Sequence, residues 1–300
     1  MKERVVNKAT KDDYNCLVIL GPTASGKTRF AVECARELDG EIISADSRQV
    51  YKGLDIGTGK DLEEYGDVPY HLIDIRNPKD EYNLFNFQQD VYSIFPKIRK
   101  RKKLPIIVGG TPLYIDAILN EYMLLPVPID MELRHDLEAL SLQDLAEVLM
   151  RLKQRVHNRS DLESSTRLIR AIEIAKYTNE HPELVDALKK KRPRIRARLL
   201  GLQVEKKDLE NKIYTRLIKR LDEGMIEEVE RLHNAGLEWE YLESLGLEYR
   251  ATSLYLRGKI ATKEEYIKTL FRKICKFAKR QRTWFRKMER EGLNIEWIRP

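Results

Sequence analysis

The sequence has few cysteines and no long apolar run. Its three cysteines, Cys16, Cys34 and Cys275, are odd in number, lie far apart and form no CxxC pair. This pattern argues against a disulfide framework and a zinc module, and it favours a reducing compartment. No apolar run approaches the roughly 18 residues that a membrane span needs, and the charged stretch 1–15 lacks the apolar core of a signal peptide. The sequence therefore predicts a soluble, cytoplasmic protein.

Internal repeats and low-complexity segments are also missing, and the composition is that of a folded protein. Hydrophobic residues make up 42% of the 300 residues, which is enough to build a core, and charged residues reach 34%, above the usual quarter. The 55 Lys and Arg exceed the 48 Asp and Glu, so the formal net charge is +7. A basic excess suits a polyanionic partner but does not identify one.

Short apolar runs alternate with helical patterns in the first part of the chain. The strand-like runs are 16–20, 41–44, 71–75 and 104–108. Their alternation with helices predicts an α/β fold, a parallel sheet flanked by helices. From Pro128 to about residue 194 only helical patterns occur, and 199–204 is expected to return as the last strand before a basic helical C-terminal region. We therefore expect a core at 14–125 and 195–300, a helical insert at 126–194 and an N-terminal tail at 1–13.

A phosphate-binding loop follows the first expected strand. The segment GPTASGKT at 21–28 fits GxxxxGK[ST] between a strand and a helix, which is the context this motif requires. Its glycines let backbone N–H groups curve around a phosphate, and the lysine adds a full charge at a helix N-terminus. The expected diphosphate-binding residues are Gly21, Pro22, Thr23, Ala24, Ser25, Gly26, Lys27 and Thr28, of which Thr28 would also offer its hydroxyl to Mg²⁺. The motif indicates a diphosphate or triphosphate without specifying ATP.

Two aspartates end apolar runs at the edge of the sheet where ligands bind. Asp46 follows the run 41–44, and from its position it could act as a general base, hold a metal ion or cap a loop. Asp74 is the rival candidate, because a strand-terminal aspartate is how many phosphate-loop enzymes hold Mg²⁺. Thr111 follows the strand-like run 104–108 and is expected to cap the next helix.

Two tracts are strongly basic. Residues 187–220 contain thirteen Lys or Arg and three acids, and residues 268–290 contain ten basic residues and one acid. The second tract forms an amphipathic helical pattern with a cationic outer face, next to the aromatic residues Trp284 and Phe285. A charge run is often only a solvated face, but this concentration with neighbouring aromatics also suits a nucleic-acid backbone and unstacked bases.

Together these segments resemble the tRNA dimethylallyltransferases, also called tRNA isopentenyltransferases. The similar stretches appear in the family's order: GPTASGKT (21–28), EIISADSRQVYKGLDIGTGK (41–60), PYHLID (69–74), FQQD (87–90), LPIIVGGTPLY (104–114), RLIRAIEI (167–174) and FAKRQRTWFR (277–286). The resemblance implies transfer of a dimethylallyl group from dimethylallyl diphosphate to N6 of the adenosine just 3′ of the tRNA anticodon. No C-terminal zinc finger is present, which favours the bacterial form. Gly59 stands where the family usually has alanine, which the sequence alone suggests is a minor change.

The resemblance also assigns roles to individual residues. It implies that Asp46 is the general base, that Thr111 contacts the same nucleotide and that Arg250 contacts the donor diphosphate. The residues implied in tRNA binding are Asp46, Ser47, Arg48, Gln49, Thr166, Arg167, Leu168, Ile169, Arg170, Lys279, Arg280 and Gln281. We expect Mg²⁺ as cofactor, the tRNA anticodon stem-loop as partner, no membrane association and a monomer. Two alternatives stay open: a phosphate-loop kinase of small molecules, and a noncatalytic RNA-binding protein with a phosphate loop.

Overall fold

The computed structural model describes residues 14–152 and 164–299, which form two compact units. The larger unit contains the described residues up to Glu121 and those from Pro193 onward, and the smaller unit is Tyr122–Arg192. The smaller unit thus begins at residue 122, where the sequence analysis placed the start of the insert at 126, and it ends at 192, where the analysis placed the end at 194. Among the described residues, no helix is both long and apolar enough to cross a membrane.

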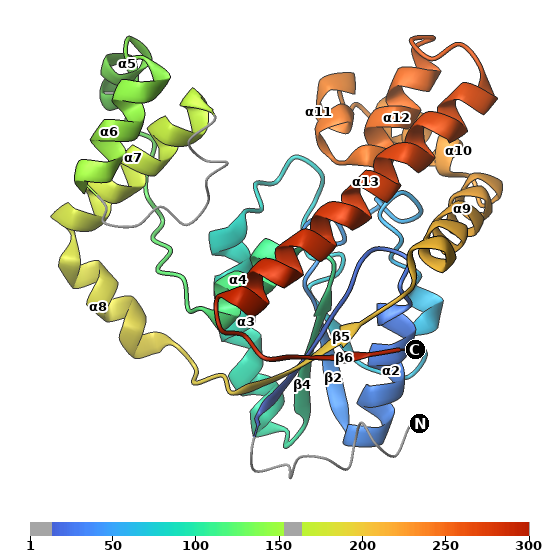
Figure 1. Cartoon of the computed structure of the whole chain (residues 1–300), viewed down its shortest axis with the longest axis horizontal. Coiled ribbons are helices and arrows are strands. Elements are labelled where there is room, and N and C mark those ends of the chain that lie inside the picture. The colour runs from blue at the N-terminus through green and yellow to red at the C-terminus, as the bar shows by residue number, and fades with distance from the viewer. Residues whose placement is uncertain (1–13, 153–163, 300) are drawn as a thin grey trace. The chain divides into compact units, whose positions relative to one another are not determined.

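The larger unit is built on a six-stranded sheet in which every pair of neighbouring strands is parallel (Figure 1). The order across the sheet is β3-β2-β4-β1-β5-β6. The strands are β1 (Cys16–Leu20), β2 (Gly40–Ser44), β3 (Tyr70–His71), β4 (Leu104–Gly109), β5 (Ala197–Leu202) and β6 (Ile295–Ile298). A parallel sheet flanked by helices is the predicted fold class, and the prediction is confirmed.

Helices cover both faces of the sheet because its central strands are apolar on both sides. Leu17 and Ile19 of β1 pack in one cluster with the buried face of α2 (Lys27–Leu38). Their neighbours on the same strand, Val18 and Leu20, pack in another cluster with α3 (Leu84–Lys100) and α4 (Pro112–Leu119). Alternate residues of one strand therefore bury against opposite layers, and the phosphate loop leaves the middle of the sheet.

Two strands differ from the expectations. The run expected as a strand at 71–75 pairs only at Tyr70–His71, because Leu72 and Asp74 adopt positive φ angles of 64° and 55° that end the strand. The strand expected as the last one is β5, which lies between β1 and β6, and β6 forms one edge of the sheet. No pattern in the sequence predicted β6, which follows the long C-terminal helix and pairs with β5.

The C-terminal region of the larger unit is helical and has its own core. Its helices are α9 (Lys206–Asp222), α10 (Met225–Asn234), α11 (Trp239–Ser244), α12 (Leu247–Leu256) and α13 (Lys263–Arg290). Apolar residues of α9, α12 and α13 meet in one buried cluster that includes Leu217, Ala251 and Ile274. This cluster sets which faces of α9, α12 and α13 turn toward the phosphate loop.

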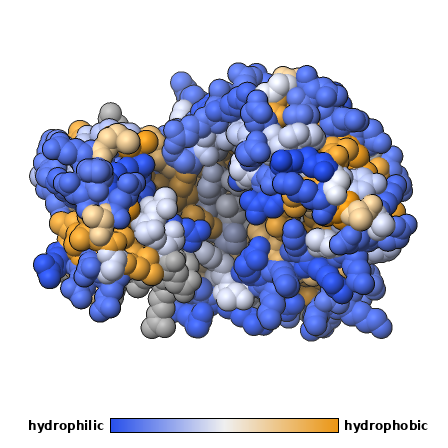
Figure 2. All heavy atoms as spheres, turned by 90° about the horizontal axis from the view of Figure 1, so that it is seen from above, coloured by the Kyte–Doolittle hydropathy of each residue, from blue (hydrophilic) through white to orange (hydrophobic). Residues whose placement is uncertain are grey.

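The described residues of the smaller unit form four helices and no strand. These are α5 (Met131–Glu138), α6 (Leu142–Leu152), α7 (Ser165–Glu180) and α8 (Pro182–Lys191). Its core joins Leu145 and Leu149 of α6 to Leu168 and Ile172 of α7. The face of the molecule drawn in Figure 2 is mostly hydrophilic, with apolar side chains in smaller groups, as the high content of charged residues requires.

Candidate active site

The phosphate loop has the shape that its sequence predicts. Gly26 adopts a φ of 87° immediately before α2, and Ala24 adopts a φ of 60°. These left-handed residues turn successive backbone N–H groups toward one side, which is how such loops form an anion-binding concavity. The Nζ atom of Lys27 donates to the carbonyl of Pro22 at 2.9 Å, so the ammonium group curls back over the loop at the N-terminus of the helix.

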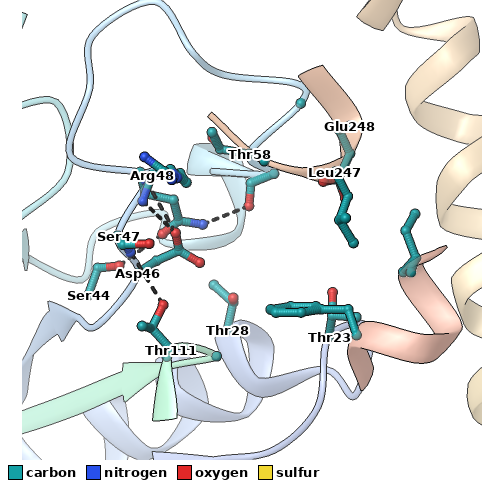
Figure 3. A pocket seen from close by; sticks show the side chains of 18 of the residues that line it. Thr23, Thr28, Ser44, Asp46, Ser47, Arg48, Thr58, Thr111, Leu247 and Glu248 are labelled. Atoms are coloured by element: carbon teal, nitrogen blue, oxygen red, sulfur yellow. Dashed lines mark hydrogen bonds between the residues drawn. The ribbon is translucent and has the colours of Figure 1, made fainter. Parts of the chain in front are cut away.

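Asp46 lies in a tight turn directly after β2. Its Oδ1 atom accepts hydrogen bonds from the backbone N–H groups of Arg48 at 2.9 Å and Gln49 at 3.4 Å. The two bonds fix the carboxylate through one oxygen only. In Figure 3, Asp46 shares the cavity with Thr28 of the phosphate loop and Thr111. The structure therefore brings together the predicted base and the predicted phosphate site.

The residues that follow Asp46 are held by a chain of polar contacts. The Oγ atom of Ser44 donates to Oε1 of Gln49 at 2.9 Å, and Nε2 of Gln49 donates to the carbonyl of Gly59 at 2.9 Å. Thr111 precedes α4 but makes no side-chain capping bond, so the expectation that its hydroxyl caps the helix is wrong. The hydroxyl instead accepts from the N–H of Ser47 at 3.4 Å, which places it in the cavity beside Asp46.

Asp74, the rival candidate for holding Mg²⁺, lies outside this cavity. Its Oδ1 atom accepts from Nζ of Lys60, a lysine that is 2% exposed. Lys60 also donates to the carbonyl of Tyr51 and to Oδ1 of Asp55. Asp74 therefore neutralises a buried cation that holds the loop at 51–60, and the lining of the cavity includes Asp46 but not Asp74.

A second buried charge holds the same loop from the other side. The carboxylate of Glu228 is 1% exposed and accepts from the backbone N–H groups of Asp55, Ile56 and Gly57 at 3.0, 2.7 and 3.1 Å. It also accepts from the hydroxyl of Tyr249 at 2.7 Å. Three amides converging on one carboxylate fix the loop, which then contributes Gly57, Thr58 and Gly59 to the cavity wall.

The cavity also contains cations that the sequence analysis assigned elsewhere. Arg216 and Arg220 of α9 line it together with Lys27. Both arginines belong to the basic tract at 187–220, for which a solvated face and a contact with nucleic acid were both considered. These two side chains line the cavity, a position that neither interpretation predicts. Their spacing of four residues places them on one face of a helix, but the sequence does not say which way that face turns.

Burial and mutual repulsion lower the proton affinity of these cations. Desolvation, then repulsion from Arg216, lowers the pKa of Lys27 to about 7, although Asp46 opposes the shift. Desolvation, followed by repulsion from Arg216, lowers the pKa of Arg220 to about 10. A cluster of cations with depressed pKa values is a site at which an anion would be stabilised.

Three further residues expected at the site have different positions. Gln281 is 2% exposed and bridges the phosphate loop, since its Oε1 accepts from the N–H of Thr23 at 2.8 Å and its Nε2 donates to the carbonyl of Gly110. It lines the cavity as an internal brace, with both ends of its amide occupied. Lys279 and Arg280 of α13 are exposed, as a contact to RNA requires.

Arg250 is not among the residues that line the cavity. Its Nε atom donates to the carbonyl of Glu243 at 2.8 Å, and the residue is exposed. From the same helix, Leu247, Glu248 and Tyr249 do line the cavity. The geometry therefore gives no support to a contact between Arg250 and a diphosphate in this cavity, and the sequence-based assignment stays a prediction.

The predicted tRNA-binding stretch 166–170 lies in α7 and contains both buried and exposed side chains. Leu168 and Ile169 are 0% and 7% exposed and pack in the core of that unit, so the expectation that their side chains bind tRNA is wrong. Thr166 and Arg167 are exposed. Arg170 donates to Glu173 at 2.6 Å and to the carbonyl of Val127 at 2.8 Å, which ties α7 to the chain entering the unit.

The cavity has a volume of about 330 Å³ and suits a phosphorylated ligand together with a magnesium ion. Among the described residues no group of three or more His, Cys, Asp or Glu side chains could hold a metal by itself. Mg²⁺ seldom needs such a cage, since it is commonly bound by one or two protein oxygens, substrate phosphates and water. Thr28 and Asp46 bring such oxygens to the cavity (Figure 3), so the donor set fits Mg²⁺ when a diphosphate is present.

Comparisons with known proteins show which family the chain is similar to. The family profile described as IPP transferase matches residues 49–288, and that described as isopentenyl transferase matches residues 14–66. The tRNA dimethylallyltransferase 2 of Treponema denticola is 54% identical over 287 residues, covering 96% of this chain and 96% of that protein. The tRNA dimethylallyltransferase of Treponema pallidum is 52% identical over 290 residues, covering 96% of this chain and 92% of that protein.

Solved structures give the same result. The crystal structure of the tRNA isopentenylpyrophosphate transferase from Bacillus halodurans matches with a TM-score of 0.68 and 35% identity, over 95% of this chain and 90% of that one. A eukaryotic dimethylallyltransferase acting on tRNA shares the fold, with a TM-score of 0.77 and 22% identity over 94% of this chain and 73% of that one. The phosphate loop, the aspartate turn and these matches along nearly the whole sequence lead to one conclusion: this chain belongs to the tRNA dimethylallyltransferase (isopentenyltransferase) family.

Proposed function

We propose that this protein transfers a dimethylallyl group from dimethylallyl diphosphate to N6 of the adenosine just 3′ of the tRNA anticodon, releasing diphosphate. One observation carries the proposal: a carboxylate held through a single oxygen and a cationic phosphate loop line the same cavity of about 330 Å³. The relatives are named tRNA dimethylallyltransferases, which supports tRNA as the acceptor and dimethylallyl as the transferred group. We further propose that the protein acts as a monomer in the cytoplasm, where tRNA is present.

The phosphate loop holds the leaving group in this proposal. Its backbone N–H groups, Lys27 and Arg216 surround the diphosphate and stabilise the negative charge that grows as the allylic C–O bond breaks. Mg²⁺, held by the hydroxyl of Thr28 with the phosphates, would neutralise part of that charge. Because Lys27 is desolvated, the binding of an anion restores its charged form at neutral pH.

Asp46 takes the proton in this proposal. The exocyclic amine of adenine is a weak nucleophile, so a base must remove its proton as the new C–N bond forms. The N–H groups of Arg48 and Gln49 fix Oδ1 of Asp46 and leave Oδ2 to receive that proton. The N6–C bond forms, the C–O bond to diphosphate breaks, and the proton passes from N6 to the carboxylate.

The adenosine must leave the anticodon loop to reach Asp46. A base inside a stack is inaccessible to an enclosed site, so such enzymes extrude their target nucleotide. Ser47, Arg48, Gln49 and Thr111 lie around Asp46 and offer polar groups to an adenine edge. The exposed cations of α13, such as Lys279 and Arg280, provide contacts for tRNA phosphates.

The test is chemical analysis of tRNA nucleosides. The protein is incubated with unmodified tRNA, dimethylallyl diphosphate and Mg²⁺, and the digested nucleosides are examined by mass spectrometry. The expected product is an adenosine carrying one dimethylallyl group, together with one released diphosphate per transfer. A protein that instead turns over ATP with a small-molecule acceptor, or that binds tRNA without modifying it, would contradict the proposal and favour one of the two alternatives.

A further inference from the structure

Gly59 lies against two arginines in a way that leaves no room for a side chain. A Cβ atom built on Gly59 would lie 1.5 Å from Nη2 of Arg220 and 2.2 Å from Nη2 of Arg216, far inside any allowed contact. Its φ of 62° is also in the left-handed region that favours glycine. The family resemblance led us to expect alanine at this position. The structure gives a reason for the glycine, because the guanidinium of Arg220 occupies the space that the methyl group of alanine would need.

Arg220 is buried without its full set of partners. It is 7% exposed, lines the cavity, and its Nε atom has no hydrogen-bond partner among the described residues. Within residues 14–152 and 164–299, Arg220 forms one ion pair, between Nη1 and Oε1 of Glu248, and its length of 3.7 Å exceeds that of a hydrogen bond. A buried guanidinium with an unused donor costs free energy unless a further acceptor arrives.

Arg220 is also placed beside another cation. Arg216 approaches the same glycine and donates to Oδ2 of Asp61 at 3.1 Å. Both guanidinium groups line the cavity with Lys27, while the carboxylates that line it are those of Asp46 and Glu248. Arg48 also lines the cavity, so four cations face two carboxylates and leave a positive site. A dianionic or trianionic group between the cations would relieve their repulsion.

We propose that Arg220, admitted by Gly59, is a second arginine of the donor site, where it binds the diphosphate beside the phosphate loop and Arg216. Glu248 keeps Arg220 in place until the diphosphate binds and limits the net charge of the cavity. The inference rests on the proposed function for the identity of the donor. The ligand chemistry itself is an inorganic diphosphate, and it can be measured without any transfer reaction.

The experiment measures, by titration calorimetry with Mg²⁺ present, the binding of inorganic diphosphate to the full chain, to four single variants and to the double variant of Gly59→Ala with Arg220→Met. Arg220→Met removes the charge and keeps much of the volume, and Gly59→Ala fills the space of the guanidinium. Lys207→Met, an exposed lysine on the same helix, is the matched control for loss of charge. Glu248→Gln removes the negative partner while leaving Arg220 charged.

We expect Arg220→Met to weaken diphosphate binding about tenfold to a hundredfold, as loss of a charge-assisted hydrogen bond to an anion does, and Lys207→Met to change it less than about twofold. Gly59→Ala should also weaken it, but should add little in the Arg220→Met background, because both changes act through one guanidinium. Glu248→Gln should tighten binding a few-fold, because a carboxylate near the diphosphate is removed.

A structural role for Arg220 alone gives a different result. If Arg220 only neutralised Glu248, both Arg220→Met and Glu248→Gln would lower the thermal midpoint and leave diphosphate affinity unchanged, which would overturn the inference. Wild-type protein that prenylates tRNA while the Arg220→Met variant binds diphosphate normally would refute the inference and keep the proposed function. Diphosphate binding that depends on Arg220 in a protein that does not prenylate tRNA would refute the function and keep the site.

Discussion

Asp46→Asn separates the chemistry of Asp46 from its structural role. Asparagine retains the Oδ1 acceptor for the N–H groups of Arg48 and Gln49, which lie 2.9 and 3.4 Å from Oδ1 of Asp46, so the turn should persist. The amide cannot accept a proton at neutral pH, so the contribution of a general base is lost. That contribution is typically a factor of about 100 to 10,000 in rate, or about 3 to 5 kcal/mol in the activation free energy.

The assay is single-turnover transfer with enzyme in excess over tRNA, followed by quantification of prenylated adenosine. The Asp46→Ala variant serves as the comparison, because it loses the base and both turn hydrogen bonds, and a capping-type loss costs about 1 kcal/mol of stability. We expect both variants to lose the rate, but only Asp46→Ala to show a lower unfolding midpoint in urea. The affinity for tRNA, measured by filter binding, should change less than about threefold for Asp46→Asn, since phosphate contacts dominate such binding.

An Asp46→Asn variant that keeps its single-turnover rate within about threefold of wild type would refute the role of Asp46 as base, because no base-dependent mechanism loses so little. Loss of tRNA affinity in parallel with the rate would refute it equally, and would assign Asp46 to recognition of the nucleotide.

Three further predictions concern other parts of the molecule. Desolvation, and then Arg216, lower the pKa of Lys27 to about 7. The affinity for diphosphate should therefore be greatest below pH 7, where Lys27 is charged, and should fall by up to about tenfold per pH unit above it. Calorimetric titrations of Lys27→Met should not show this fall. Gln281→Leu leaves the N–H of Thr23 and the carbonyl of Gly110 without their buried partner, which should lower the free energy of unfolding by about 2 to 4 kcal/mol in urea and raise the KM for the donor. Glu173→Ala in the smaller unit removes a carboxylate that is 2% exposed and accepts from two arginines, and should destabilise the unit by roughly 2 kcal/mol in a two-probe thermal unfolding experiment.

The sequence predicted the parts of the site that are local. The loop at 21–28 forms its anion-binding turn from its own glycines, and Asp46 follows its strand directly, so neighbouring residues determine both shapes. The parallel sheet was also predicted, because its strands are continuous apolar runs. The place of β5 beside β1 was not predicted, since that pairing joins segments about 180 residues apart and no local pattern specifies it.

The direction in which each helix faces was the harder part. Glu248 lines the cavity, and Arg250, two residues later on the same helix, is turned by about 200° from it. Arg250 was therefore expected in the diphosphate site, but its helix turns the side chain away from that cavity. On α9 the difference is reversed. In the sequence Arg216 and Arg220 belong to a basic tract typical of a surface, but in the structure the packing of α9 against α12 and α13 directs both side chains into the cavity.

The brace formed by Gln281 has a consequence for how the protein acquires its activity during synthesis. The phosphate loop is made early, yet one of its amides is held by a side chain that is synthesised 258 residues later, and the same side chain holds the neighbouring Gly110. A shortened product that stops before α13 would carry every residue of the loop without the clamp that keeps it in shape. Activity should therefore appear in one step as the last helix docks, and incomplete chains should neither consume the prenyl donor nor mark tRNA.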